Sequence, residues 1–313
     1  MGHKLRSPEL HDLVEVTTRT FQERLLLRPS PELREIVLGV LGRAQSKYDM
    51  PLHACAFLSN HYHLLCSPSD PQHLASFMNF FNSKLAREVG RLHNWRGHVW
   101  DEPYHAIRVS EEPEAQIGRL KYLLSQGCKE GFVITPGDWP GVQCVSALLD
   151  GQPLHGIWFD RTKEYAARRR GLDCRPRDFA TAETVVLAPL PCWRQLTAST
   201  RRELVSDLVH QVEQEAELLR RATGREPRGV AFILGQHPHG RPLRSKRSPA
   251  PLVHAASAAV RRAFLEAYRI FVAAYRAASQ RVRLGDRHVA FPEGSFPPQL
   301  PFVRGPSPAR TSS

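Results

Sequence analysis

Two histidines two positions apart, His61 and His63, have the types and spacing to bind a metal. They lie in PLHACAFLSNHYHLLC (51–66), a run of apolar and β-prone residues that predicts paired strands. Side chains alternate faces along a strand, so both imidazoles point the same way. Two neutral imidazoles on a rigid sheet are half of a divalent-metal site, which still needs a third ligand and a nucleophile. The same pattern also fits two partly buried surface histidines.

A second group lies on a helix predicted from Glu112 to Gln126, where apolar residues recur at helical spacing. Tyr122 and Gln126 are four residues apart and share one face of that helix. A tyrosine hydroxyl and an amide oxygen are the groups that the histidine pair lacks. Alone, Tyr122 also fits an ordinary amphipathic core residue and Gln126 a surface residue.

The elements that position these residues alternate between strand and helix. LVEVTTR (13–19) predicts a first strand, and Ser30 is a candidate N-cap for the helix that follows. A helix with an apolar stripe is predicted over 71–92, and a short strand over 106–109. Short antiparallel strands interleaved with helices predict a compact α+β sandwich. Lys84 and Arg87 on the 71–92 helix either face a phosphate backbone or are simply solvated.

Charge is distributed unevenly between the two halves of this 313-residue chain, whose length suggests two folding units. Residues 1–150 hold 16 Lys and Arg against 17 Asp and Glu, whereas residues 151–313 hold 27 against 14. A basic second half predicts a polyanionic partner, most simply nucleic acid. A basic surface without a dedicated ligand is the alternative.

Cysteine spacing and hydropathy indicate in which cellular compartment the protein is expected. The six cysteines form no C-x-x-C pair and no secretory leader precedes them, so we expect reduced thiols in a cytoplasmic protein. No apolar run approaches the roughly 18 residues that a membrane span needs, so no membrane partner is expected.

The second half of the chain is predicted to be mainly helical, with a connector before the helices and a proline-rich tail after them. Residues 151–195 are interpreted as a connector, and a capping box at Thr200 and Glu203 predicts a helix that stops at Gly224. A further long helix is expected from about Val253 to Gln280, before a proline-rich tail from Phe291. Four basic residues of the intervening loop are read as phosphate contacts, with a merely solvated loop as the alternative: Arg241, Arg244, Lys246 and Arg247.

The order of these motifs resembles the single-tyrosine HUH transposases, and most closely the REP-associated tyrosine transposases. The resemblance covers about residues 10–145. It is carried by Asn60-His61-Tyr62-His63-Leu64-Leu65, by Trp100 with His105-Ala106-Ile107-Arg108, by Tyr122-Leu123-Leu124-Ser125-Gln126, by Gly131-Phe132-Val133 and by Asp138-Trp139-Pro140. The chain departs from the family where Tyr-x-x-x-Asn-Pro-Val-Arg is common, since Gln126 is followed here by Gly127-Cys128-Lys129.

The resemblance implies a ferredoxin-like antiparallel sheet with helices of the HUH nuclease type in a catalytic domain over residues 1–150. The residue patterns described above add the connector over 151–195 and a mainly α-helical basic region over 196–313. The resemblance also implies a divalent metal, Mg²⁺ or Mn²⁺, held by His61, His63 and Gln126. Tyr122 would attack single-stranded DNA beside a hairpin and form a 5′-phosphotyrosine link, the metal offsetting the weak nucleophilicity of a phenol with a pKa near 10. Arg108 and Lys129 join Lys84 and Arg87 as candidate DNA contacts.

Three functions stay open at this stage. The first is an active metal-dependent DNA endonuclease and transesterase, cytoplasmic and nucleoid-associated, with a homodimer allowed. The second is a catalytically silent, domesticated binder of DNA hairpins. A hydrolase of small phosphoesters is the third, and it would leave the basic half without a purpose.

Overall fold

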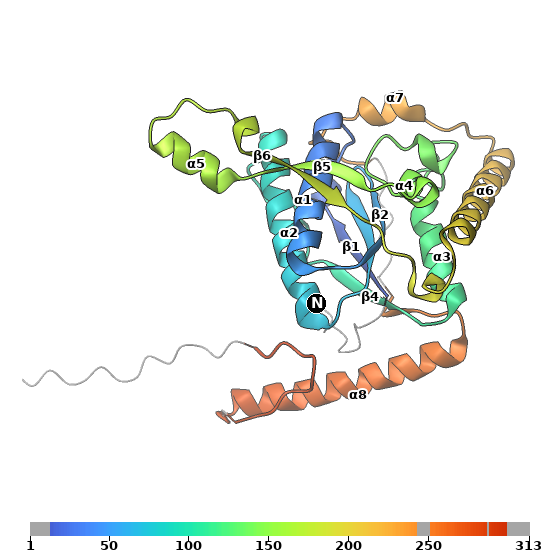
Figure 1. The fold of residues 1–313 in the computed structure, drawn as a ribbon. Helices are drawn as coiled ribbons and strands as arrows, with labels where there is room; N and C mark the ends of the chain where they lie inside the picture. The colour runs from blue at the N-terminus through green and yellow to red at the C-terminus, as the bar shows by residue number, and fades with distance from the viewer. Residues whose placement is uncertain (1–12, 243–250, 287, 299–313) are drawn as a thin grey trace, which may run out of the picture.

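A five-stranded sheet forms the centre of the protein, which we describe from a computed structural model over residues 13–242, 251–286 and 288–298. Its strand order is β2-β3-β1-β4-β7 (Figure 1). Neighbouring strands are antiparallel except β4 and β7, which are parallel. The bounds are β1 Val14–Arg19, β2 Leu52–Phe57, β3 His61–Cys66, β4 His105–Val109 and β7 Val253–His254. The predicted α+β fold with a ferredoxin-like antiparallel sheet is confirmed.

Two long helices cover one face of this sheet, α1 (Pro31–Tyr48) and α2 (Pro71–Leu92), which lie side by side (Figure 1). Each begins at a residue whose side chain accepts a hydrogen bond from the first turn: Ser30 from the Leu33 amide and Asp70 from the His73 amide. The expected N-cap at Ser30 is therefore confirmed. The apolar faces of both helices are buried, and Phe77 and Phe81 of α2 stack over the sheet at a ring distance of 6.1 Å.

The opposite face is covered by α3 (Pro113–Leu124), which packs on β2 and β4. The sequence predicts that this helix extends to Gln126, but it ends two residues earlier, at Leu124. Gly127 has a φ of +89°, a left-handed conformation that ends the helical path. Gln126 thus lies just past the last turn, and its side chain returns to the helix through a bond to the Tyr122 carbonyl.

Residues 151–195, predicted to be a connector that packs on the first domain, form a β-hairpin arm across α1. Its strands are β5 (Leu154–Phe159) and β6 (Ala180–Val185), paired antiparallel, with α5 (Arg161–Arg169) between them. The arm lies so close to α1 that only glycine fits at the crossing. A Cβ added to Gly39 would stand 2.0 Å from the Ile157 carbonyl oxygen, and one added to Gly156 would stand 2.1 Å from the Gly39 nitrogen.

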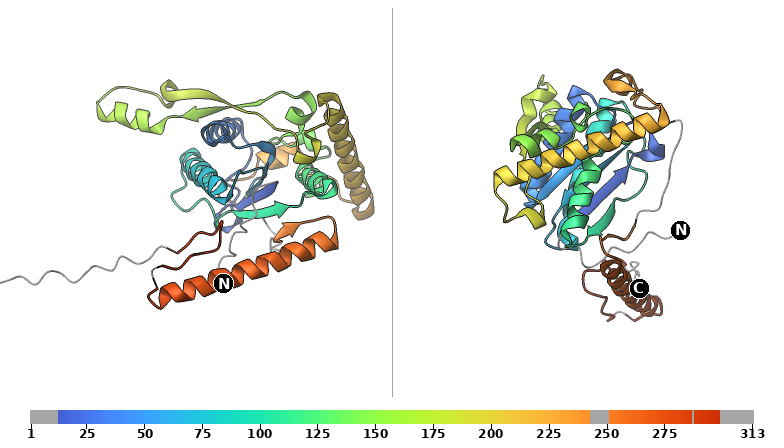
Figure 2. Two further views of the ribbon diagram at one scale, coloured as in Figure 1. Left: turned by 60° about the horizontal axis from the view of Figure 1, so that its bottom comes forward. Right: turned by 90° about the vertical axis from the view of Figure 1, so that its right-hand side faces the viewer.

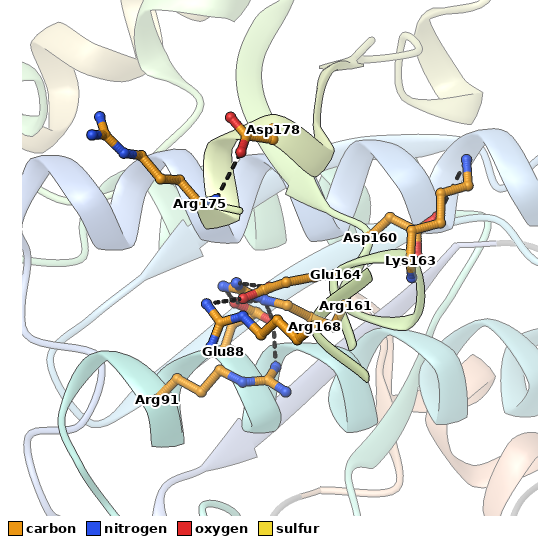
Figure 3. A network of polar contacts seen from close by, with 9 residues as sticks. All are labelled: Glu88, Arg91, Asp160, Arg161, Lys163, Glu164, Arg168, Arg175 and Asp178. Carbon is orange, nitrogen blue, oxygen red and sulfur yellow. Dashed lines mark hydrogen bonds and ion pairs between the residues drawn. The ribbon is translucent and has the colours of Figure 1, made fainter. Parts of the chain in front are cut away.

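Buried carboxylates attach this arm to α2 (Figure 3). Glu88 of α2 receives the Arg161 guanidinium through Nε at 2.9 Å and Nη2 at 2.5 Å. The other side of that guanidinium, Nη1, donates to Glu164 at 2.7 Å. Two half-exposed arginines also form ion pairs with these carboxylates: Arg91 with Glu88 and Arg168 with Glu164. The arm is therefore joined to the domain by a compact ion network as well as by the contact with α1.

The last third of the chain is mainly helical, as predicted, but two boundaries differ. Helix α6 (Ala198–Thr223) begins at Thr197, whose hydroxyl accepts from the Thr200 amide, so the expected capping box at Thr200 and Glu203 is wrong. It stops before Gly224, as expected. Val253 opens no helix, because β4 offers a free edge that Val253–His254 extends as a fifth strand. Helix α8 (Ala258–Arg283) begins only after it, at Ser257.

Helix α8 runs beside the domain and not within its core (Figure 2). The remaining short elements are α4 (Val145–Asp150), α7 (Gly229–Leu234) and the 3-10 turns Phe21–Glu23, Pro136–Asp138, Pro176–Phe179 and Pro191–Trp193. Within the described ranges, no helix combines the length and the apolar character needed to cross a membrane.

Candidate active site

His61 and His63 lie on the face of β3 that α3 covers. Their ring centroids are 5.2 Å apart and the rings are nearly perpendicular. Tyr62, between them, points to the opposite face, where its ring packs on Phe57 and Phe81 and its hydroxyl donates to Asn82 at 2.5 Å. The alternation predicted from the sequence is confirmed, and the fully buried Tyr62 cannot reach a substrate at the histidines.

One nitrogen of each histidine is held by an oxygen acceptor. Nδ1 of His63 lies 2.8 Å from Glu15 Oε1, and Nδ1 of His61 lies 2.8 Å from Asn60 Oδ1. Since these oxygens can only accept, each Nδ1 carries the proton and each Nε2 presents a lone pair. The His63 Nε2 is buried and has no hydrogen-bond partner among the described residues. Orienting contacts of this kind are what a metal-binding histidine requires.

The pKa of His61 keeps its imidazole in the neutral form that binds metals. Loss of surrounding water lowers this pKa well below the ordinary value, and the neighbouring His63 and Arg19 lower it further. Arg19 is the cross-strand partner of His61 in β1.

Glu15 of β1 is a buried carboxylate at the centre of the site, and sequence reasoning missed it. Beside His63 it contacts Arg119 of α3, with Nη2 2.7 Å from Oε2, and His254 of β7, with Nε2 2.7 Å from Oε2. Burial acts to raise the pKa of Glu15, but these contacts, first that from His254, outweigh it and hold the pKa far below the usual range. The only sequence signal was an acidic residue at an inward position of an apolar strand.

Tyr122 of α3 stands over the histidines. Its ring centroid lies 5.5 Å from that of His63, edge to face. Two cations flank the ring: the Arg119 guanidinium at 4.0 Å from the centroid and the Lys129 ammonium at 4.8 Å. The Tyr122 hydroxyl makes no hydrogen bond with any part of the chain that the structure describes. A tyrosine ring with two cations next to it is suited to meet a phosphate.

Gln126 lies on the same face, buried, with its amide nitrogen donating to the Tyr122 carbonyl at 3.0 Å. It lines a small cavity of about 10 Å³ together with Ala56, the cross-strand partner of His63. Partners across antiparallel strands share a face, so this cavity lies beside the histidine pair. Because the nitrogen is engaged, the amide oxygen is the atom left for a ligand.

These side chains fit a divalent cation through two imidazole nitrogens and one amide oxygen. Among the described residues, no group of three or more His, Cys, Asp or Glu side chains is arranged to hold a metal ion, so the third protein ligand here would have to be the Gln126 amide. A set of three neutral ligands leaves coordination positions for phosphate oxygens and water. The orphaned His63 Nε2 is the observation that supports this fit.

The residues predicted to contact DNA lie in different parts of the structure. Lys129 stands at the site, over Tyr122, and the Arg87 side chain is exposed near the end of α2. Lys84 packs against the stacked rings of Phe80 on α2 and Trp158 on the arm. The remaining predicted contacts are Arg108, which lies 5.8 Å from the Phe264 ring of α8; Arg241, which donates to Gln22; and Arg244, Lys246 and Arg247, which fall outside the described residues.

Comparison with known proteins gives one family. Residues 21–126 match the model of the IS200-like transposases. A solved REP-associated tyrosine transposase bound to a REP hairpin is 15% identical, with 48% of this chain and 86% of that chain covered at a TM-score of 0.39. A protein from Deinococcus radiodurans described as a putative transposase is 20% identical, with 38% and 93% covered at 0.27. None of the curated proteins compared with this chain matches it.

Proposed function

We propose, on the premise that this chain carries an IS200-like transposase domain, that it cleaves and rejoins single-stranded DNA through a covalent link to Tyr122. The observation that carries the proposal is the edge-to-face contact of Tyr122 with His63, whose Nε2 is buried and unpartnered. A nucleophile and a ligand nitrogen are thereby brought to one place from α3 and β3.

In this reaction the Tyr122 oxygen bonds to the phosphorus of a phosphodiester, and the bond from phosphorus to the 3′ oxygen breaks. The phenol proton is released to water, and the departing oxygen takes up a proton to leave as a 3′-hydroxyl. The DNA remains joined to the protein by a 5′-phosphotyrosine. Attack by a 3′-hydroxyl on this link reverses the step and rejoins a strand without ATP.

Each polar residue has a role in this scheme. A divalent cation, Mg²⁺ or Mn²⁺, bound by His61, His63 and Gln126 supplies charge for the phosphate oxygens as they become more negative. Glu15 holds His63 in the tautomer that frees Nε2, and Arg119 ties that carboxylate to the nucleophile's helix. Lys129 and Arg119 place positive charge next to the Tyr122 ring, where the phosphate would arrive.

The substrate proposed is single-stranded DNA beside a hairpin, because an unpaired backbone can bend into a site between a sheet and a helix. The net positive charge of residues 151–313 supports a nucleic-acid partner. A silent DNA-hairpin binder with the same fold is the second candidate, and the same experiment separates the two.

The test is denaturing gel electrophoresis of the full chain incubated with labelled hairpin DNA carrying single-stranded flanks, with and without Mn²⁺. We expect a labelled covalent adduct with wild type that is absent from Tyr122→Phe, whose ring packs identically but lacks the nucleophilic oxygen. Tyr165→Phe is the matched control, since Tyr165 is an exposed residue of the arm. Binding without adduct in wild type would support the silent binder, and adduct in Tyr122→Phe would move the nucleophile elsewhere.

A further inference from the structure

A groove at the end of α2 combines positive charge with aromatic rings outside the candidate active site. We call it the arginine groove: it is formed by Arg87 and Arg91 of α2 and by Asn94, Trp95, Arg96 and Trp100 of the loop that follows. Its volume is about 650 Å³, within the roughly 300–1,000 Å³ typical of ligand sites. No carboxylate lines it.

The charge of the groove is only partly neutralised. Arg91 donates to Glu88 at 2.8 Å and keeps half of its side chain exposed. Arg87 and Arg96 are exposed and have no ion-pair partner in the described part of the chain. Uncompensated guanidinium groups around a concave surface favour an anion with several oxygens, and phosphate suits their planar geometry.

The aromatic wall of the groove is held rigidly. The Trp95 amide donates to the Gly90 carbonyl at 2.8 Å, and the Trp95 indole nitrogen donates to the His98 carbonyl at 3.0 Å. Arg24 covers one face of the indole, 5.0 Å from its centroid. A Cβ at Gly97 would stand 3.1 Å from the ring, so this glycine lets the loop fold closely against it. The His239 ring also contacts Trp95, at 5.2 Å between centroids. Trp95 and Trp100 thus form a fixed aromatic wall next to the arginines, and such a wall is a surface on which a base can pack.

The groove adjoins the end of the sheet at which His61 lies. Thr20, which directly follows β1, forms an isolated bridge with Trp100, and its amide donates to the Asn60 carbonyl at 2.9 Å. Arg19, one residue earlier, is the cross-strand partner of His61. The groove lies on the sheet face that α2 covers, where Trp100 packs on Tyr62, so a DNA strand from the candidate active site reaches it around this end of the sheet.

From this charge, these rings and this position, we infer that the arginine groove binds an unpaired nucleotide of the single-stranded DNA flanking the cleavage site. The phosphate contacts Arg87, Arg91 and Arg96, and the base stacks on the tryptophan wall. This inference rests on the proposed function, because it names the part of that substrate which lies beyond the reacting phosphate.

The test measures binding of the full chain in excess EDTA, so that it does not depend on cleavage. The probes are one DNA hairpin with a single-stranded flank and the same hairpin with blunt ends, compared by fluorescence anisotropy over a salt series. The variant is Arg87→Glu with Arg96→Glu. Arg202→Glu with Arg225→Glu, on α6 and just after it, is the control with the same charge change at exposed positions.

We expect the groove variant to lose at least roughly tenfold in affinity for the flanked hairpin and about 1.4 in the slope of log affinity against log salt, since two single-stranded contacts contribute about 0.7 each. Its affinity for the blunt hairpin should stay unchanged, as should both affinities of the control. Equal losses on both probes would overturn the inference in favour of a duplex contact. Equal losses of affinity in the groove variant and the control variant would overturn the inference in favour of a general charge effect.

The stacking half is tested on the DNA, where a change cannot unfold the protein. Replacing the nucleotides of the flank one at a time by abasic residues should reveal one position that weakens wild-type binding roughly tenfold. The same replacement should lower the DNA affinity of the groove variant less, because that variant no longer binds this nucleotide in the groove. A flank in which no position responds would overturn the stacking role. Because no cleavage is involved, failure of the adduct assay leaves this result intact, and the reverse also holds.

Discussion

Glu15 Oε1 accepts a hydrogen bond from His63 Nδ1 at 2.8 Å, although the two residues are 48 positions apart. The same carboxylate contacts Arg119 of the helix that carries Tyr122 and His254 of the edge strand. One buried side chain thus connects a candidate metal ligand, the helix that carries Tyr122 and the C-terminal region.

Glu15→Gln should weaken Mn²⁺ binding roughly 10- to 100-fold, the usual cost of losing a contact that orients a ligand. The amide lacks the charge that fixes the His63 tautomer and balances Arg119. Isothermal titration with Mn²⁺ measures this directly, with Glu114→Gln, an exposed acid on α3, as the control. Unchanged Mn²⁺ affinity in folded Glu15→Gln would mean that the carboxylate serves packing alone.

His61→Ala and His63→Ala should each abolish adduct formation, and EDTA should do the same to wild type. Each variant removes one of the two imidazole ligands, and the amide of Gln126 cannot replace it. Electron paramagnetic resonance of bound Mn²⁺ provides a readout independent of cleavage, and His155→Ala, at an exposed position of β5, is the control. Cleavage at full rate in excess chelator would exclude a metal.

His53 should make folding stability fall in mild acid. Its ring is buried between the Ala188 carbonyl and the Ser67 hydroxyl, and burial lowers the pKa of His53 to about 4. The unfolded chain, with an ordinary histidine pKa near 6.5, binds this proton first as pH falls. The free energy of unfolding should therefore decrease by up to about 1.4 kcal/mol per pH unit between these two values from this residue alone.

Urea unfolding at pH 7 and pH 5 measures that decrease, and other histidines add to it. His53→Gln keeps a donor and an acceptor at this position but does not titrate, so it should lose less stability between the two pH values than wild type. An identical decrease in both proteins would show that the buried ring does not control the acid response.

Arg161→Ala should destabilise the arm by about 1–3 kcal/mol, because each buried carboxylate loses one hydrogen-bond partner and keeps only a half-exposed one, Arg91 or Arg168. Both Glu88 and Glu164 lose a guanidinium in this variant (Figure 3). Arg168→Ala is the matched control, because Arg168 is 55% exposed and should contribute less than about 1 kcal/mol. Urea unfolding and limited proteolysis within 151–195 compare them. Equal resistance of the two variants would leave the contact with α1 as the arm's main attachment.

Much of the catalytic domain is predictable from the sequence because its signals are local. The alternation that places His61 and His63 on one face needs only the six residues of β3. Ser30 caps its helix by accepting a hydrogen bond from the amide of Leu33, three residues later. The end of the Tyr122 helix was placed two residues late, because Gly127 in a left-handed conformation, and no change in apolar pattern, ends it. The helix start at 198 is hard to predict because Thr197, Ser199 and Thr200 are all suitable caps. The start at 258 is hard to predict because Val253–His254 pair with β4 before the helix begins.

The amino-acid sequence by itself determined the strand that carries the histidines, the helix that carries Tyr122, and their order, because each depends on periodicity and capping among neighbours. Only the tertiary structure decided which distant groups meet: Glu15 with His63, His254 with Glu15, and Thr20 with Trp100 beside the arginine groove. A buried polar group needs a partner, but any donor that folding brings within reach can satisfy it, so no spacing in the chain marks that partner in advance.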